Sequence, residues 1–282
     1  MNYSLDELIQ EATRLPPIPQ AAQKALAFIR DPGSSASDLA AVLGNDQVLS
    51  AHILRWANSA LYGMENRIAT VQQAIVVLGL TTVQELILAH SMADRLNKPM
   101  PGYELNRGDL WHHAVGTAIG AKQISKERGL KINEEAYFAG LLCDIGKLVF
   151  EKLLRNTDTS QPEWAHQPFQ EMELATFGMD HAMLGAEMAR RWQLPDHLVA
   201  TIAYHHNPEE APPAHLSLVS AVHVADAAMM MMGVGLGIDG LQYKLDLEAL
   251  KRLRMDEQDL SIMVEKISDQ LTHAKELIYF GK

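Results

Sequence analysis

The chain has 282 residues, of which 48% are hydrophobic and 21% are charged, as is usual for a globular protein with a sizeable core. Its formal net charge of −11 disfavours electrostatic binding to nucleic acid or to an anionic membrane, because both need clustered Lys and Arg. The single cysteine excludes an internal disulfide framework and is compatible with a reducing cytosol.

The beginning of the chain carries no sign of export. Residues 1–15 contain acidic side chains and lack the apolar stretch of a signal peptide. The one candidate for a membrane span, residues 216–238, holds His223 and Asp226 near its centre, where ionisable side chains are costly in a bilayer. We therefore expect a buried core helix at this position, no membrane association and a cytoplasmic location.

Helical periodicity dominates the sequence, and no run of alternating polar and apolar residues indicates a strand. This predicts an all-α fold. The strongest internal linker signal is KPMPGYELN at residues 98–106. We therefore divide the chain into an N-terminal helical subdomain (1–100), a second helical subdomain (101–240) and C-terminal helices that pack on the core (241–282). The predicted helices cover residues 4–14, 19–31, 35–43, 47–58, 71–78, 81–97, 107–128, 133–154, 165–176, 180–193, 195–206, 214–232, 246–253 and 256–280.

Two of these helices place an ionisable side chain on an apolar face. His113 shares a helical stripe with Leu110 and Ile124 and should face inward. Asp144 lies within the apolar run AYFAGLLCDIGKLVF. A carboxylate buried there is costly unless it is paired or coordinates a metal.

Further candidate ligands follow along the chain. His181 comes directly after Asp180, an expected helix N-cap that would fix the position of its side chain. His205 and His206 end a helix where the chain opens into NPEEAPP, which gives access to solvent and substrate. Asp226 interrupts the apolar run VSAVHVADAAMMMM and needs a partner.

Several His and Asp residues on different helices together indicate a metal site, although a lone buried histidine is more often part of the core. Mixed His/Asp ligation suits Fe, Mn, Ni or Zn with open coordination positions rather than a closed structural zinc site. Open positions allow a bound water to lose a proton near neutral pH and a phosphoryl oxygen to be polarised. The alternative is a cluster that holds no metal.

The motifs around these residues occur in the order of a known family. The chain contains WHHAVGTA, FAGLLCDIGKL, HAMLGAEMARRWQLP and IAYHHNP, preceded by LPPIPQAAQKALAFI, VLSAHILRWANSALYG and RIATVQQAIVVLGLTTVQELILA. Together they resemble the HDOD domain, an HD-GYP-related branch of the HD superfamily of metal-dependent phosphohydrolases, over about residues 8–230. The resemblance implies an all-α, multi-helical HD-domain-like bundle with an N-terminal helical subdomain, used in bacterial signalling. It also implies metal ligands at His113, Asp144, His181, His205, His206 and Asp226.

The chain departs from the family at Cys143, which stands where the His-Asp pair has its histidine. A cysteine thiolate can still ligate a metal and favours softer ions such as zinc. Equally, the residue can be a small buried apolar side chain. We favour the buried role, because free cysteine is commonly part of the core.

Two further positions bear on catalysis. In an active enzyme the resemblance implies a catalytic role for Asp144 and a phosphate contact for Lys147, whose alternative role is that of a lysine on a helix surface. Where cyclic-di-GMP phosphodiesterases of the HD-GYP branch carry a Gly-Tyr-Pro loop, this chain has NPEEAPP. That difference argues against phosphodiesterase activity.

Three functions are compatible with these observations. We favour a regulatory module of bacterial signal transduction, catalytically impaired at Cys143-Asp144, that binds a signalling protein or a nucleotide-like ligand. The alternative is a metal-dependent phosphohydrolase acting on a nucleotide or other phosphoester, with Asp144 as ligand and proton acceptor and Lys147 steadying the phosphate. DNA binding through residues 38–59, which have a helix-turn-helix cadence, is disfavoured by the acidic charge, so we expect no nucleic-acid partner.

Overall fold

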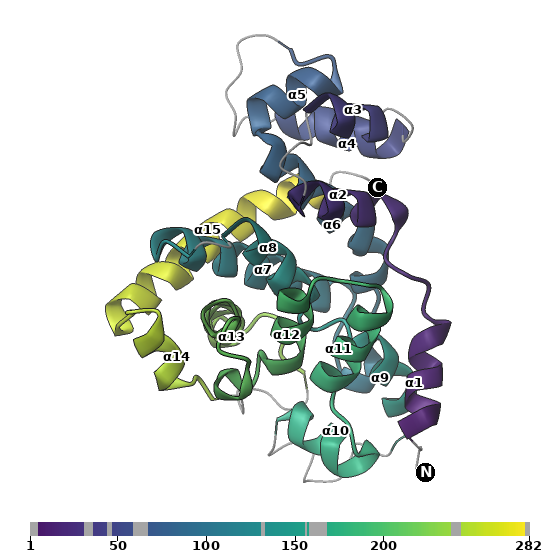
Figure 1. Cartoon of the computed structure of the whole chain (residues 1–282), viewed down its shortest axis with the longest axis vertical. Coiled ribbons are helices and arrows are strands. Elements are labelled where there is room, and N and C mark those ends of the chain that lie inside the picture. Colours follow the sequence, from purple (N-terminus) through teal and green to yellow (C-terminus); the bar gives the residue numbers. More distant parts are fainter. Residues whose placement is uncertain are drawn as a thin grey trace. The chain divides into compact units, whose positions relative to one another are not determined.

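The computed structural model describes residues 5–30, 36–43, 47–58, 67–130, 133–155, 157, 168–237 and 244–279. Within these ranges the regular secondary structure is helical, and the one exception is an isolated antiparallel bridge between Met100 and Leu105 (Figure 1). The predicted all-α fold is confirmed. The chain falls into two compact units, the first formed by Met1–Pro17 with Arg95–Leu271 and the second by Ile18–Asp94 with Thr272–Lys282. The three-segment division expected from the sequence stays a prediction.

The second unit has a hydrophobic core of its own. Its helices are α2 (Gln20–Arg30), α3 (Ala36–Leu43), α4 (Gln47–Ala57), α5 (Val71–Leu78) and most of α6 (Leu80–Leu96). A capping box starts α5, because the Thr70 side chain accepts from the Gln73 amide while the Gln73 side chain accepts from the Thr70 amide. The core is made by side chains such as Leu39, Leu49, Ile53, Trp56, Ile75 and Val83.

The first unit contains the remaining helices. They are α1 (Leu5–Arg14), η2 (Pro101–Tyr103), α7 (Asp109–Glu127), α8 (Asn133–Leu142), α9 (Lys147–Leu154), α10 (Phe169–Phe177), α11 (His181–Arg191), α12 (Asp196–Tyr204), η4 (Pro208–Glu210), α13 (Leu216–Met231), α14 (Leu247–Arg252) and most of α15 (Glu257–Tyr279). Helix α13 is central: it packs on α7, α8, α12 and α14, and Figure 1 shows it end-on. Every side chain from Leu218 to Met230 is buried, as expected of a helix that is apolar on all sides.

The apolar segment over residues 216–238 is therefore largely accounted for by the buried helix α13. No single described helix is both long and apolar enough to cross a membrane. Helices α5 and α6 reach that length and composition only as a pair, and the chain bends by 112° between them.

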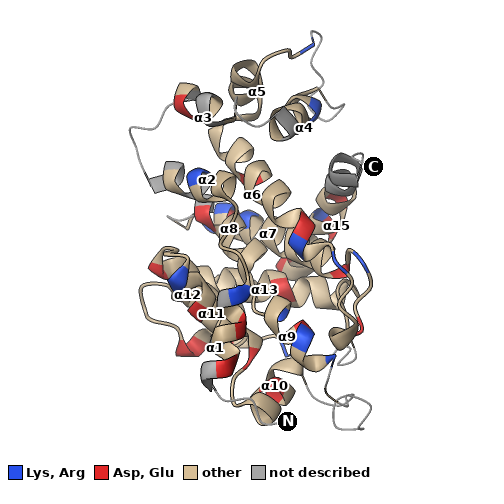
Figure 2. Ribbon diagram, turned by 90° about the vertical axis from the view of Figure 1, so that its right-hand side faces the viewer, with Lys and Arg blue, Asp and Glu red and all other residues tan. Residues whose placement is uncertain are grey.

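Charged residues are mixed along the described helices. Figure 2 shows Lys and Arg interspersed with Asp and Glu. Helices α3 and α4, which cover most of the segment with helix-turn-helix cadence, bury Leu39, Leu49 and Ile53 in the core of their own unit. A mixed distribution of charge gives little attraction for a polyanion. The absence of a nucleic-acid partner stays an expectation.

One predicted helix is wrong in a way that matters for the site. Residues 133–154 do not form a continuous helix: α8 ends at Leu142, α9 begins at Lys147, and residues 143–146 form a turn with bonds of the i→i−3 type. This turn packs so tightly on the start of α11 that a Cβ added to Gly146 would lie 1.9 Å from the carbonyl oxygen of His181. The glycine permits the close approach, and the turn places Asp144 outside a regular helix.

Candidate metal centre

The structure brings the six predicted ligands together in the first unit. They come from five points of the bundle: the first half of α7, the α8–α9 turn, the start of α11, the residues after α12 (both His205 and His206) and the middle of α13. Asp180 caps α11 as predicted, because its side chain accepts from the Met183 amide at 2.7 Å, and His181 follows directly. The six residues form two groups that share Asp144: Asp144 with His181, His205 and His206, and Asp144 with His113 and Asp226.

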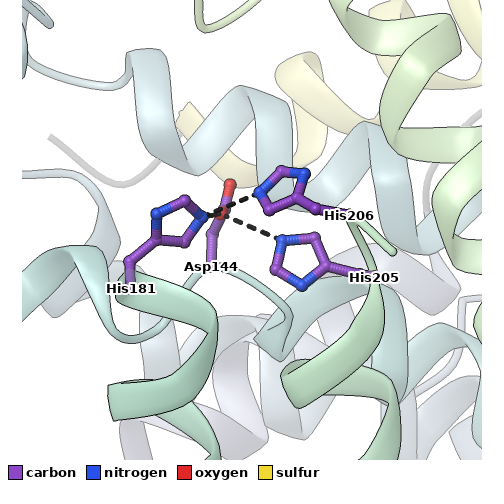
Figure 3. A group of neighbouring side chains, drawn as sticks. All are labelled: Asp144, His181, His205 and His206. Carbon is purple, nitrogen blue, oxygen red and sulfur yellow. Dashed lines mark hydrogen bonds and ion pairs between the residues drawn. The ribbon is translucent and has the colours of Figure 1, made fainter. Parts of the chain in front are cut away.

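The first group has the spacing of a metal site. In Figure 3 the three imidazoles and the carboxylate point toward one another. His181 Nε2 lies 2.9 Å from His206 Nε2 and 3.3 Å from Asp144 Oδ1, and His205 Nε2 lies 3.6 Å from the same oxygen. Bonds of about 2.0–2.2 Å to one ion would place neighbouring ligand atoms roughly 3–3.5 Å apart, close to these separations.

Two buried atoms of this group have no hydrogen-bond partner. They are Asp144 Oδ1 and His205 Nε2, and both residues are at most 1% exposed. The Nδ1–H of His205 donates to the Ile202 carbonyl at 2.9 Å, so in the neutral ring the lone pair on Nε2 faces Asp144. Two electron-pair donors that face each other in the interior are costly, and a cation between them would satisfy both. The residues present therefore fit a divalent metal ion.

The second group is held by hydrogen bonds within the protein. His113 donates from Nδ1 to the Val234 carbonyl at 2.9 Å and from Nε2 to Asp226 Oδ1 at 2.6 Å. Its Nε2 also lies 3.6 Å from Asp144 Oδ2. Burial alone would lower the pKa of His113, but the Asp226 carboxylate outweighs burial and leaves the pKa raised.

For two residues of the first group, Asp144 and His206, the electrostatics favour the forms that bind a metal. Burial alone would raise the pKa of the Asp144 carboxyl, but the Lys147 ammonium and the imidazoles beside it hold that pKa well below its usual range. Although His206 is partly exposed, desolvation of its ring and repulsion by neighbouring imidazoles hold its pKa well below the ordinary value. An ionised carboxylate and an unprotonated imidazole are the states that a metal requires.

Comparison with known proteins identifies the family. A model of the HDOD domain matches residues 15–208. The chain belongs to the HDOD domain family. The match ends two residues after His206, so Asp226 is a ligand candidate that lies outside the matched region.

Solved structures support the HDOD fold over nearly the whole chain. An HDOD domain protein of unknown function from Geobacter sulfurreducens has a TM-score of 0.76 and 25% identity, and the similarity covers 98% of this chain and 100% of that one. A protein from Shewanella amazonensis SB2B, provisionally named a phosphohydrolase, has a TM-score of 0.69 and 26% identity, covering 96% and 97%. An uncharacterised protein of Treponema pallidum (strain Nichols) is 28% identical over 230 residues, 78% of this chain, but the match spans only 44% of that relative.

The Cys143 thiol of this HDOD protein is hydrogen-bonded to the backbone. Neither group contains it, its side chain is fully buried, and its thiol donates to the Gly140 carbonyl oxygen at 3.2 Å. Burial raises the pKa of the thiol well above its usual value, and the charge of Asp144 raises it further. The geometry favours a core thiol over a thiolate ligand.

Lys147 is neither a surface lysine nor aimed at solvent. It begins α9 and is only 5% exposed, with Nζ 3.0 Å from Asp144 Oδ2 and 6.0 Å from the centre of the Tyr103 ring. Its burial does not fit the helix-surface role considered from the sequence, whereas the phosphate contact stays a prediction. A buried charge of this kind is stable only when it is paired, and Asp144 supplies the pair.

Sequence reasoning missed Glu173 of α10. This fully buried carboxylate accepts the Nδ1–H of His181 at 2.6 Å and the His181 backbone amide at 2.7 Å, and it also accepts from the Tyr103 hydroxyl. With the Glu173 carboxylate nearby, the pKa of His181, which burial alone would lower, rises to about 10. A carboxylate that takes the Nδ1 proton of a histidine directs its Nε2 toward a metal position.

A second missed contact supports His205. The buried side chain of His223 on α13 donates from Nδ1 to the His205 carbonyl oxygen at 2.7 Å, and its Nε2 accepts from the Asp246 amide at 2.9 Å. Asp246 is the N-cap of α14. The backbone at His205 is thereby tied both to the central helix and to the start of the C-terminal helices.

Proposed function

We propose that this HDOD protein is a regulatory module of bacterial signal transduction that holds a divalent metal ion in its His/Asp cluster and is impaired as a phosphohydrolase. Family membership supports the signalling role. The module would act on a signalling protein in the cytoplasm. Alternatively, it would respond to a nucleotide-like phosphoester that reaches the cluster past the partly exposed His206. No nucleic acid or membrane takes part in this proposal.

The observation that supports impaired catalysis is the cysteine at position 143. The HDOD resemblance places a ligand histidine at this position, and the thiol instead donates into the protein toward Gly140. Loss of even a supporting residue around a metal commonly costs 10–100-fold in affinity or activity. A centre that is one ligand short is therefore expected to hold its ion less tightly and to turn over substrate poorly.

The residues that would hold the ion are the three imidazoles of the first group and the Asp144 carboxylate. A bound ion would supply Lewis acidity near a phosphoryl oxygen. The protein itself contributes the orientation of the ligands: Glu173 fixes His181, and the Ile202 carbonyl fixes the tautomer of His205. Imidazole nitrogen with carboxylate oxygen favours Fe, Mn, Ni or Zn over Ca, which prefers a shell of oxygen atoms.

A turnover assay with a restored histidine tests the proposal. Wild-type protein, Cys143→His and Asp144→Ala are each loaded with Mn, Fe, Ni or Zn and assayed on bis(p-nitrophenyl) phosphate and on a panel of nucleotides. We expect wild-type turnover to equal that of Asp144→Ala, and Cys143→His to gain turnover because it restores the missing ligand type. Wild-type turnover that disappears in Asp144→Ala would contradict the proposal.

The same assay distinguishes the alternative, a working metal-dependent phosphohydrolase for a nucleotide or other phosphoester. Two neighbouring ligand groups that share Asp144 favour this alternative, as does the similarity to the Shewanella protein. In that case the wild-type protein would hydrolyse at least one substrate of the panel, with a loss in Asp144→Ala.

A further inference from the structure

The two oxygens of Asp144 face two chemically different surroundings. We call the side of Oδ1 the imidazole half (Asp144 Oδ1, His181, His205, His206) and the side of Oδ2 the lysine half (Asp144 Oδ2, Lys147, His113, Asp226). We propose that the cluster takes one divalent ion, in the imidazole half, and that the ammonium group of Lys147 occupies the place of a second ion in the lysine half. This inference rests on the metal binding in the proposed function.

Two buried atoms of the imidazole half are left unsatisfied by the protein. Asp144 Oδ1 and His205 Nε2 are buried without a hydrogen-bond partner. The ring nitrogen of His181 lies 3.3 Å from Asp144 Oδ1 and 2.9 Å from that of His206. Unsatisfied atoms in the interior and ligand-like separations both indicate that an ion belongs among these four side chains.

The donors of the lysine half are already engaged. His113 Nε2 and Asp226 Oδ1 are 2.6 Å apart, which is the length of a charge-assisted hydrogen bond and well below the roughly 3–3.5 Å expected between two ligands of one ion. Asp144 Oδ2 accepts from Lys147 Nζ at 3.0 Å. A divalent ion placed here would break both contacts and lie next to a buried ammonium group.

Access to the two halves also differs. The loop after α13 covers His113, since Val234 accepts its Nδ1–H and a Cβ added to Gly235 would lie 2.7 Å from the His113 Cβ. Gly235 has a φ of 76°, so glycine suits this position in backbone conformation as well as in size. In the imidazole half, His206 is partly exposed. An ion can therefore enter and leave on the His206 side.

Metal stoichiometry of a lysine variant tests the inference. Apo-protein prepared without a His-tag is titrated with Co²⁺, the d–d absorbance is followed, and the bound metal is counted by ICP mass spectrometry. We expect one ion per chain in the wild type and two in Lys147→Met, because the variant removes the ammonium group and frees Asp144 Oδ2. Lys152→Met is the matched control: Lys152 lies on the same helix with a side chain that is 57% exposed, and this variant should bind one ion.

A second pair of variants locates the ion if Lys147→Met does not fold. His206→Ala should weaken Co²⁺ binding by at least 10-fold, whereas His113→Ala should keep one ion with its absorbance bands unchanged. Two ions in the wild type, loss of the ion in His113→Ala alone, or a single ion in folded Lys147→Met would each overturn the inference while leaving metal binding intact. No ion in folded wild-type protein would instead contradict the proposed function.

Discussion

Asp144 is buried beside one ammonium group and several imidazoles, and this arrangement keeps its carboxylate ionised in the interior. Its carboxylate is paired by Lys147 on one side and faces the electron pair of His205 on the other. Asp144 Oδ2 is thus hydrogen-bonded, whereas Asp144 Oδ1 and His205 Nε2 face each other without a hydrogen-bond partner. Asp144 thereby has one oxygen in a satisfied ion pair and one oxygen without a partner, and we propose that an ion binds on the unsatisfied side.

Glu173 supplies the sharpest prediction at this scale. Glu173→Gln should weaken metal binding about 10–100-fold, because the amide no longer provides the charge that draws the Nδ1 proton of His181 and directs Nε2 to the ion. Competition with a chromophoric chelator measures the affinity, and circular dichroism checks the fold. Glu171→Gln, at an exposed position of the same helix, should bind as the wild type does. Equal affinities of the two variants would show that Glu173 does not position the ligand.

The ligand candidates could be found from the sequence because a His or Asp within an apolar helical run is unusual. His113, Asp144 and Asp226 stand out in this way. Glu173 could not be found, since a glutamate in QEMELATF looks the same as its exposed neighbour Glu171. The burial of Lys147 could not be predicted either, because it depends on the turn before α9 rather than on the local pattern.

At the scale of elements, the turn between α8 and α9 decides where Asp144 points. Gly146→Ala should lower the free energy of unfolding by about 3 kcal/mol or more, because the added Cβ would lie 1.9 Å from a backbone oxygen of α11 that cannot easily move. Urea denaturation in the presence of chelator measures this. Gly129→Ala is the control: Gly129 has a φ of 64° with open space around it, so only backbone strain of about 1–2 kcal/mol is expected. A smaller loss for Gly146→Ala than for Gly129→Ala would contradict the account of the turn.

Most helices follow from periodicity and from caps such as Asp180, which are local signals. The break at residues 143–146 does not, because apolar residues continue through it and periodicity alone predicts one helix over residues 133–154. The turn that follows α8 is in tight contact, at Gly146, with the start of α11, which lies 35 residues later in the chain. A local pattern carries no information about such a contact.

At the scale of the whole molecule, all six ligand candidates belong to the first unit, and the second unit has a separate core. The all-α fold and the family could be predicted, because the motifs are many and occur in order. The three-segment division of the chain stays a prediction, and the assignment of parts of both α6 and α15 to each of the two units depends on tertiary contacts that a local pattern does not contain. The matched region spans 44% of the Treponema relative.

The most direct test of the central claim is the metal content of the purified chain. Protein prepared without a His-tag and without chelator is analysed by ICP mass spectrometry, beside Asp144→Ala prepared in the same way. We predict close to one equivalent of iron, manganese, nickel or zinc per chain in the wild type and a loss of that metal in the variant. Folded wild-type protein with no transition metal, or an equal metal content in both proteins, would contradict a metal centre built on Asp144.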